Sequence, residues 1–295
     1  MKRSDFIKAL SAMPIAMGLS SLSDLSKLSD SLTPSEKMPV LFLGHGSPMN
    51  AIEENQFVRG FRNAAANIKT TPTAILCVSA HWFTRGTKVT AMEMPPTIHD
   101  FGGFPQALFD VEYPAPGHPE LANETAKILS PTEVELDQNW GLDHGAWSVI
   151  KHMYPDANIP VIQLSIDYTK PATYHYELGK KLSELRSKGV LIVGSGNIIH
   201  NLRMVDWRNI NTVDHGYDWA HEAHEEINKY ILDGDFKPLL EYKSKGTAWN
   251  NAIPTPEHYL PLLYSLALRE GSEEITLFND HLLAGSLSMT SLRIG

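Results

Sequence analysis

Three short apolar runs, each leading to a histidine, constrain this chain more than any other feature. His45 follows PVLFLG, His81 follows TAILCVSA and His200 follows GVLIVGSGNII. Runs of this length, rich in Val, Ile and Leu, predict buried strands of the parallel type. Ligands of open α/β sheets bind beyond the carboxyl ends of the strands. We therefore expect the three histidines to converge on one site, and a metal ion is its natural occupant.

The rest of the chain alternates between strand and helix patterns. Further strands are expected at 88–93, 159–167, 274–277 and 286–294, and helices at 55–68, 117–129, 139–154 (after an initial turn), 171–187, 215–232 and 257–269. The stretch 94–116, rich in Pro, Gly and aromatic residues, is expected to be a binding loop or lid. With 295 residues and 42% hydrophobic content, the pattern predicts a single-domain α/β sandwich whose central sheet is mixed, largely parallel and flanked by helices.

Residues 1–37 differ in composition from the remainder. A basic start is followed by a short apolar stretch and then by a polar run, which is the order of an export signal. The start is similar to a twin-arginine signal, with Lys2 in place of the first arginine. We expect a leader at 1–37 and a catalytic domain at 38–295. The location is either the periplasm, reached through this leader, or the cytoplasm, with 1–37 a flexible amphipathic segment.

Charge and composition exclude several classes of function. A formal net charge of −9 argues against a nucleic-acid partner, which calls for a basic face. The apolar stretches fall short of a membrane span. The single cysteine, Cys77, excludes an internal disulfide and a multi-thiolate zinc site. Dinucleotide, Walker, HExxH and GxSxG motifs are absent from the sequence.

A third ligand could come from Glu257 or His258, which follow a Pro-x-Pro run. Both are expected in the first turn of a helix, facing about 100° apart, so only one can face a metal held by His45 and His81. Glutamate would complete the two-histidine, one-carboxylate site of non-haem iron, whereas histidine would complete a three-histidine site. The spacing leaves both open.

Other histidines divide into two groups. His99 and His144 lie in glycine-bearing loops beside an aspartate, and we expect them to contact substrate or support the ligands. His221 and His224 lie on a polar helix pattern and are expected to be solvated. His200 could be a ligand or an acid/base group, because an imidazole near its reference pKa serves either role.

Seven blocks, in this order along residues 38–295, resemble a known family: GHGSPMN, SAHWFTRGTKVTAM, PPTIHDFGGFPQALFDVEYPAPG, GLDHGAWSV, SGNIIHNL, PTPEHYLPLLY and GSLSMTSLRIG. The family is that of the DODA-type extradiol ring-opening dioxygenases, within the class III LigB-like superfamily. The resemblance implies a monomeric or weakly associated α/β protein with one mononuclear divalent metal at the mouth of its sheet.

The resemblance also implies residue roles. His45, His81 and His258 match the metal ligands of the family, which decides between Glu257 and His258 in favour of histidine. His200 matches the acid/base histidine, and metal-bound members of the family can count it as a fourth ligand. Fe(II) is expected for activity, although a histidine site also suits Zn(II), which can be the metal found in the isolated protein.

The implied reaction is the extradiol opening of a catechol by O2, with L-DOPA or a related catechol cleaved at its 4,5 bond. We expect His99, His144, Trp82 and Phe101 to form the substrate wall. Two other functions remain open on the same histidines. One is a zinc hydrolase with Glu257 or Asp143 as base, and the other is a non-catalytic metal-binding interaction protein.

Overall fold

The computed structural model describes residues 37–210 and 212–295, which lie in one compact unit. The expected leader at 1–37 falls outside the described residues except for Lys37. Within the described ranges, no helix combines the length and the hydropathy that crossing a membrane requires.

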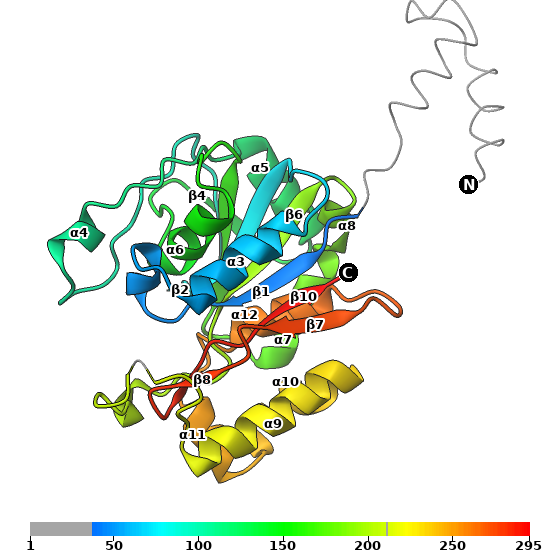
Figure 1. The fold of residues 1–295 in the computed structure, drawn as a ribbon. Helices are drawn as coiled ribbons and strands as arrows, with labels where there is room; N and C mark the ends of the chain where they lie inside the picture. The colour runs from blue at the N-terminus through cyan, green and yellow to red at the C-terminus, as the bar shows by residue number, and fades with distance from the viewer. Residues whose placement is uncertain (1–36, 211) are drawn as a thin grey trace, which may run out of the picture. The chain divides into compact units, whose positions relative to one another are not determined.

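A sheet of eight strands forms the centre of the molecule, in the order β4-β3-β5-β2-β6-β1-β10-β7 (Figure 1). The strands are β1 Val40–Gly44, β2 Ala74–Thr84, β3 Thr87–Thr90, β4 Val134–Asp137, β5 Val161–Asp167, β6 Val190–Gly196, β7 Ile275–Phe278 and β10 Ser291–Ile294. Strands β5, β2, β6 and β1 are parallel neighbours. Antiparallel pairings join β10 to β1, β7 to β10 and β3 to β5. The prediction of a mixed, largely parallel sheet is confirmed.

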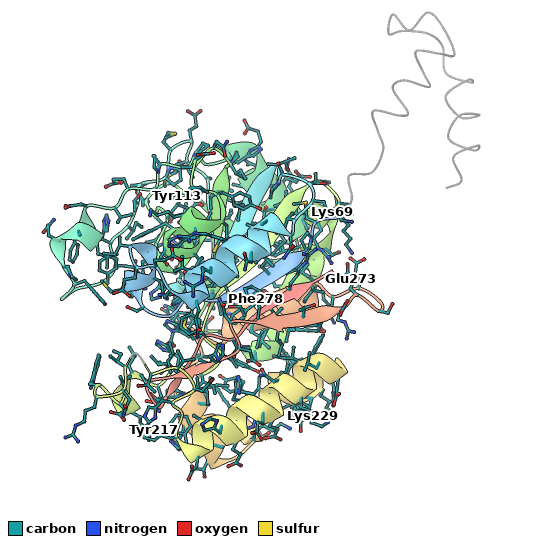
Figure 2. The ribbon with its side chains drawn as sticks, viewed as in Figure 1. Lys69, Tyr113, Tyr217, Lys229, Glu273 and Phe278 are labelled. Carbon is teal, nitrogen blue, oxygen red and sulfur yellow. The ribbon has the colours of Figure 1, made fainter. Side chains whose placement is uncertain are left out.

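Helices cover both faces of this sheet. They are α3 Gln56–Ala66, α4 Gln106–Phe109, α5 Pro119–Ile128, α6 His144–Met153, α7 Ala172–Lys181, α8 Ser183–Arg186, α9 Asp218–Asp233, α10 Lys237–Leu240, α11 Thr247–Ala252 and α12 Leu260–Ala267. Two short strands, β8 Leu282–Leu283 and β9 Leu287–Ser288, form a separate ribbon. Figure 2 shows Lys229 extending outward from α9, whereas Tyr113 is buried.

Alternate residues of the central strands enter two separate cores. Val40 and Phe42 of β1 pack in the core that includes α7, α9 and α12. Leu41 and Leu43, their neighbours in sequence, pack in the core that includes α3 and α6. Because side chains alternate across a strand, a strand buried on both faces is apolar at every position. This is why the runs could be identified from the sequence.

Backbone hydrogen bonds join the ends of these strands to the segment before α12. The amide of His45 donates to the carbonyl of Gly196 (3.0 Å), and the amide of Asn197 donates to the carbonyl of His258 (2.9 Å). A Cβ atom at Gly196 would lie 2.1 Å from the carbonyl oxygen of His258. Glycine at this position is therefore required for the close approach that brings His258 to the strand ends.

Several elements differ from the sequence-based expectations. Strand β2 continues past His81 to Thr84, with a register shift against β5 between Val78 and Phe83. Such an irregularity re-aims side chains. Strand β4 was not expected, and the expected helix 171–187 is divided into α7 and α8.

The start of α12 also differs from the expectation. The helix begins at Leu260, so Glu257 and His258 lie in the preceding turn rather than in its first turn. Proline has no amide hydrogen and fits the first turn of a helix, and Pro261 occupies that turn. Helix α11 ends at Ala252, just before the Pro-x-Pro run.

Candidate metal centre and active-site cavity

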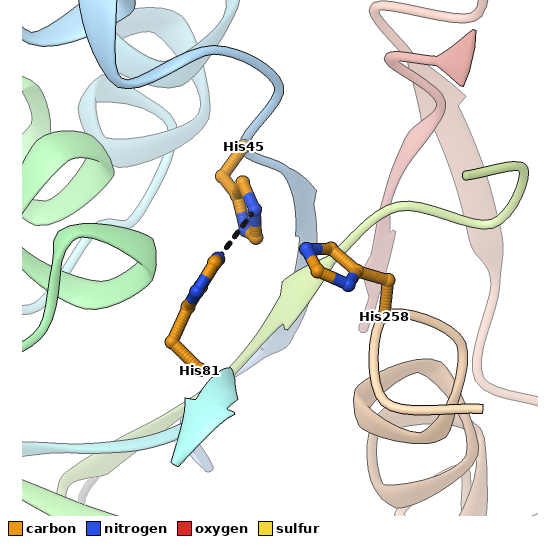
Figure 3. Close-up of side chains that lie close together, drawn as sticks. All are labelled: His45, His81 and His258. Carbon is orange, nitrogen blue, oxygen red and sulfur yellow. Dashed lines mark hydrogen bonds between the residues drawn. The ribbon is translucent and has the colours of Figure 1, made fainter. Parts of the chain in front are cut away.

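Three histidines that are far apart in the sequence meet beyond the carboxyl end of β1. His45 directly follows β1, His81 projects from β2, and His258 comes from the turn before α12 (Figure 3). One ring nitrogen of each lies within 4.8 Å of those of the other two. The Nε2 atoms of His45 and His81 are 3.3 Å apart. His45 and His81 therefore converge as the strand pattern predicts, whereas the third member of this cluster is His258 and not His200.

The outer ring nitrogens of two of these histidines are already engaged. His45 Nδ1 lies 3.0 Å from the hydroxyl of Ser195, and that hydroxyl donates its own proton to the carbonyl of Gly145. The Ser195 oxygen must therefore accept the Nδ1 proton of His45. His81 Nδ1 lies 3.1 Å from Asp100 Oδ2. In the neutral form of both rings, each Nε2 is thus left with a lone pair, and two lone pairs 3.3 Å apart favour a cation between them.

His258 rather than Glu257 completes the group. The cluster that contains His45 and His81 includes His258. The carboxylate of Glu257 instead accepts a hydrogen bond from Thr255 Oγ1 (2.7 Å) and lies 3.5 Å from His258 Nδ1. The donor set that the structure brings together is therefore three imidazoles, which fits a divalent metal such as Fe(II) or Zn(II).

Burial keeps most of these rings neutral, as metal ligands must be. Desolvation and the neighbouring histidines hold the pKa of His45 well below its usual value. For the same reasons, the pKa of His258 falls to about 4 and that of His200 to about 2, with Glu257 opposing the decrease in both. Burial also lowers the pKa of His81, but the hydrogen bond to Asp100 and the nearby carboxylates outweigh it and raise the pKa overall.

Asp100 orients two rings at once and was not among the residues predicted from the sequence. Its Oδ1 accepts from both the backbone amide and Nδ1 of His144 (2.9 Å each), while Oδ2 accepts from His81. Burial raises the pKa of Asp100, but these hydrogen bonds outweigh it and hold the pKa well below its usual value. Its position beside His99 in the loop 94–116 was the available signal. Ser195, which orients His45, was also not predicted from the sequence.

Asp143 has a structural role in the described chain. It is fully buried and caps α6 by accepting from the amide of Ala146. Its two oxygens also accept from Ser79 Oγ, Gln163 Nε2 and Trp140 Nε1. With its acceptor positions occupied by these donors, Asp143 is poorly placed to serve as the base of a hydrolase.

His200 lies flat against His258. Their ring centroids are 3.6 Å apart and the planes are inclined by 10°, and the backbone amide of His200 donates to Ala252. The stack places His200 beside the trio rather than within it. Both roles predicted for His200, acid/base group and fourth ligand, remain predictions.

A cavity of about 340 Å³ opens over these rings. Its lining comprises His45, Gly46, Ser47, Pro48, His81, Phe104, His144, Asn197, His200, Leu202, Val205, Trp207, Ile210, His258 and Leu287. His144, predicted for the substrate wall, is among them. Phe104 belongs to the stretch 94–116, which was expected to be a binding loop. The apolar lining residues Leu202, Val205, Trp207 and Ile210 were not anticipated.

Three residues predicted for the substrate wall lie outside this lining. His99 packs against Trp147 and places its Nε2 2.9 Å from the Val111 carbonyl. Trp82 is buried and stacks on Trp140. Phe101 packs edge-on against His144. These three rings pack against neighbouring side chains and do not line the cavity, so this geometry does not support their direct contact with substrate.

The two histidines of α9 have different surroundings. His221 is exposed, as expected. His224 is mostly buried, and its Nε2 lies 2.7 Å from Asp280 Oδ1. The expectation that His224 is solvated is wrong, because the loop after β7 folds over that part of α9.

Comparisons with known proteins point in the same direction as this geometry. A family model described as the catalytic LigB subunit of aromatic ring-opening dioxygenase matches residues 39–283. A protein of Escherichia coli (strain K12) named 4,5-DOPA dioxygenase extradiol is 51% identical over 271 residues, which are 90% of this chain and 98% of that protein. A protein of the same name from Beta vulgaris is 35% identical over 259 residues, covering 85% of this chain and 94% of that one.

Among solved structures, the crystal structure of an uncharacterized protein from Escherichia coli K12 matches with a TM-score of 0.75 and 45% sequence identity. The match covers 88% of this chain and 100% of the other.

Proposed function

The chain belongs to the LigB family of extradiol ring-cleaving dioxygenases, and we propose that it opens the ring of L-DOPA or a related catechol at the 4,5 bond, using O2 and Fe(II). The observation that carries the proposal is the pair of Nε2 atoms 3.3 Å apart on His45 and His81, with His258 beside them and an open cavity above.

The residues present fit a divalent metal held by His45, His81 and His258. When bound, such a metal supplies Lewis acidity for a catechol and, as Fe(II), the redox capacity that Zn(II) lacks. The protein's contribution is to orient two of these rings, His45 through Ser195 and His81 through Asp100.

His200 is proposed to accept a proton from the catechol. Its pKa of about 2 in the ligand-free chain, caused by burial and by the neighbouring histidines, means that its ring is neutral at pH 7 and has a nitrogen lone pair available. A negative charge developing on a catechol oxygen nearby would raise that pKa, so the ring can take the proton and return it later. The stack on His258 fixes the plane of the ring.

His144 is proposed to hydrogen-bond the substrate. Asp100 accepts from its Nδ1, which leaves Nε2 as the nitrogen available to a ligand, and the residue lines the cavity. Because the backbone amide of His144 is bonded to the same carboxylate oxygen, the ring is held before substrate arrives.

The test is anaerobic loading of the metal-free protein with Fe(II), followed by L-DOPA and air. Ring opening gives a semialdehyde, which cyclises to a yellow product. Formation of this product together with a matching uptake of oxygen supports the proposal. Zn(II)-loaded protein and the His200→Ala variant are the controls, and neither should consume oxygen at a comparable rate. If no catechol leads to oxygen uptake, the proposal fails.

A further inference from the structure

One part of the cavity wall is apolar. We call this part the apolar lip, and it consists of Leu202, Val205, Trp207, Ile210, Leu287 and Phe104. The rest of the lining consists of the five histidines, Asn197, Gly46, Ser47 and Pro48. No Lys, Arg, Asp or Glu is among the described residues that line the cavity.

The lip exposes large apolar side chains. Trp207 is 70% exposed, Leu202 is 60% exposed and Ile210 is 40% exposed. These three belong to one short segment, so their exposed surface is contiguous with the cavity rather than scattered over the molecule. Contiguous exposed apolar surface at the mouth of a cavity indicates a surface that a ligand covers.

The segment that carries the lip is anchored at Asp206. The backbone amide of Asp206 donates to the carbonyl of Ala284, and its Oδ2 lies 2.9 Å from His215 Nε2. Asn201, just before the segment, donates from its amide to the carbonyl of Ser286. The lip is therefore held in place by bonds that do not involve a ligand.

Among the described residues, the charged side chains of the lip segment do not line the cavity. Arg203 and Arg208 lie on the same segment, but both are exposed and neither lines the cavity. Asp206 is paired with His215, and Glu257 accepts from Thr255. A charged ring substituent would thus stay in water, gaining nothing from the lip, or be desolvated without a partner, which is costly.

We propose that the preferred substrates are catechols whose ring substituent is apolar and uncharged, with the substituent covering the lip. This inference rests on the proposed extradiol activity. Transfer of one methylene group from water to an apolar surface strengthens binding about fourfold. A four-carbon substituent that is partly buried should therefore strengthen binding of the catechol by about tenfold or more.

The test compares L-DOPA with 4-isobutylcatechol, in which methyl groups replace the ammonium and carboxylate groups. With the Fe(II)-loaded enzyme, kcat/KM for 4-isobutylcatechol should exceed that for L-DOPA by about tenfold or more. Binding to Zn(II)-loaded protein, measured by titration calorimetry, gives a second readout without turnover and should show the same order. Equal or tighter binding of L-DOPA, with equal or higher kcat/KM, would overturn the inference.

Two substitutions probe the lip itself. Trp207→Ala and Leu202→Ala should each lower the ratio of kcat/KM for 4-isobutylcatechol to that for L-DOPA by about threefold or more. Leu232→Ala, at an exposed leucine on α9 outside the lining, should leave the ratio unchanged. An unchanged ratio in both lip variants counts against the inference.

Variants of Arg203 and Arg208 test the alternative that a cation on this segment binds the substrate. If L-DOPA is preferred and Arg203→Ala or Arg208→Ala removes that preference, a cation reaches the substrate and the inference is wrong. If oxygen is consumed but 4-isobutylcatechol is not preferred, the result contradicts the role of the lip and leaves the proposed function standing. Absence of oxygen uptake with every catechol instead contradicts the proposed function, and the Zn(II) titration still decides whether the lip binds apolar substituents.

Discussion

Asp100 Oδ2 lies 3.1 Å from Nδ1 of His81, and the hydrogen bond between them leaves Nε2 of the neutral His81 ring free of a proton. The same carboxylate accepts from His144 through its other oxygen. One acidic side chain therefore sets the orientation and the tautomer of a candidate ligand and of a candidate substrate-binding ring.

Asp100→Asn should weaken metal binding by about 10- to 100-fold. Asparagine has a single acceptor oxygen, so it cannot accept from both rings. Competition with a chromophoric chelator measures the affinity. The matched control is Asp110→Asn, an exposed residue of the same loop whose side chain bonds Gln106. Equal affinity in the Asp100 variant and the wild type would contradict the orienting role.

His258→Ala should lose the bound metal after dialysis, whereas Glu257→Gln should retain it. The reason is that His258 belongs to the cluster with His45 and His81, while Glu257 bonds Thr255. Metal per protein chain, measured by atomic emission, separates the two variants. The opposite pattern would assign the third ligand to the carboxylate.

His200→Phe should lower kcat by about 10²- to 10⁴-fold while leaving the metal content unchanged. Phenylalanine keeps the flat contact with His258 but has no nitrogen to accept a proton. Steady-state oxygen uptake and metal analysis are carried out on the same preparation. If the variant loses its metal together with its activity, His200 acts as a ligand.

Protonation of His175 should lower the free energy of unfolding in mild acid. This residue is fully buried on α7, with Nδ1 3.0 Å from the Tyr264 hydroxyl, and burial lowers its pKa from 6.5 to about 4. The unfolded chain binds this proton more readily. Stability contributed by the neutral ring is thus complete above pH 6.5 and declines as the pH falls towards 4. The loss is on the order of 3 kcal/mol.

Urea unfolding of metal-free protein between pH 7.5 and 4.5 tests this, with His175→Gln as the comparison because glutamine does not titrate. Other buried histidines affect both proteins equally, so the difference between the two pH profiles isolates His175. Parallel profiles would show that the ring is not buried in its neutral form.

Much of the fold could be predicted from the sequence for one physical reason. A strand buried on both faces must be apolar at every position, so the runs that lead to His45, His81 and His200 were recognisable. Because neighbouring parallel strands end at the same edge of a sheet, their convergence could also be expected.

The choice between Glu257 and His258 could not be made from their spacing. It depends on where α12 begins and on the close approach that Gly196 allows to the His258 carbonyl. The resemblance to a family indicated the histidine, but the residue pattern alone left both side chains available.

What the sequence by itself determined is the buried central strands and the histidines that follow them, since burial and alternation are local properties of the chain. Only the tertiary structure decided how those rings are held. Ser195 is 150 residues from His45, and Asp100 reaches His81 and His144 from a loop that has no regular pattern. Hydrogen bonds and cavity walls of this kind depend on distances that are set only when remote segments pack together, so no local pattern encodes them.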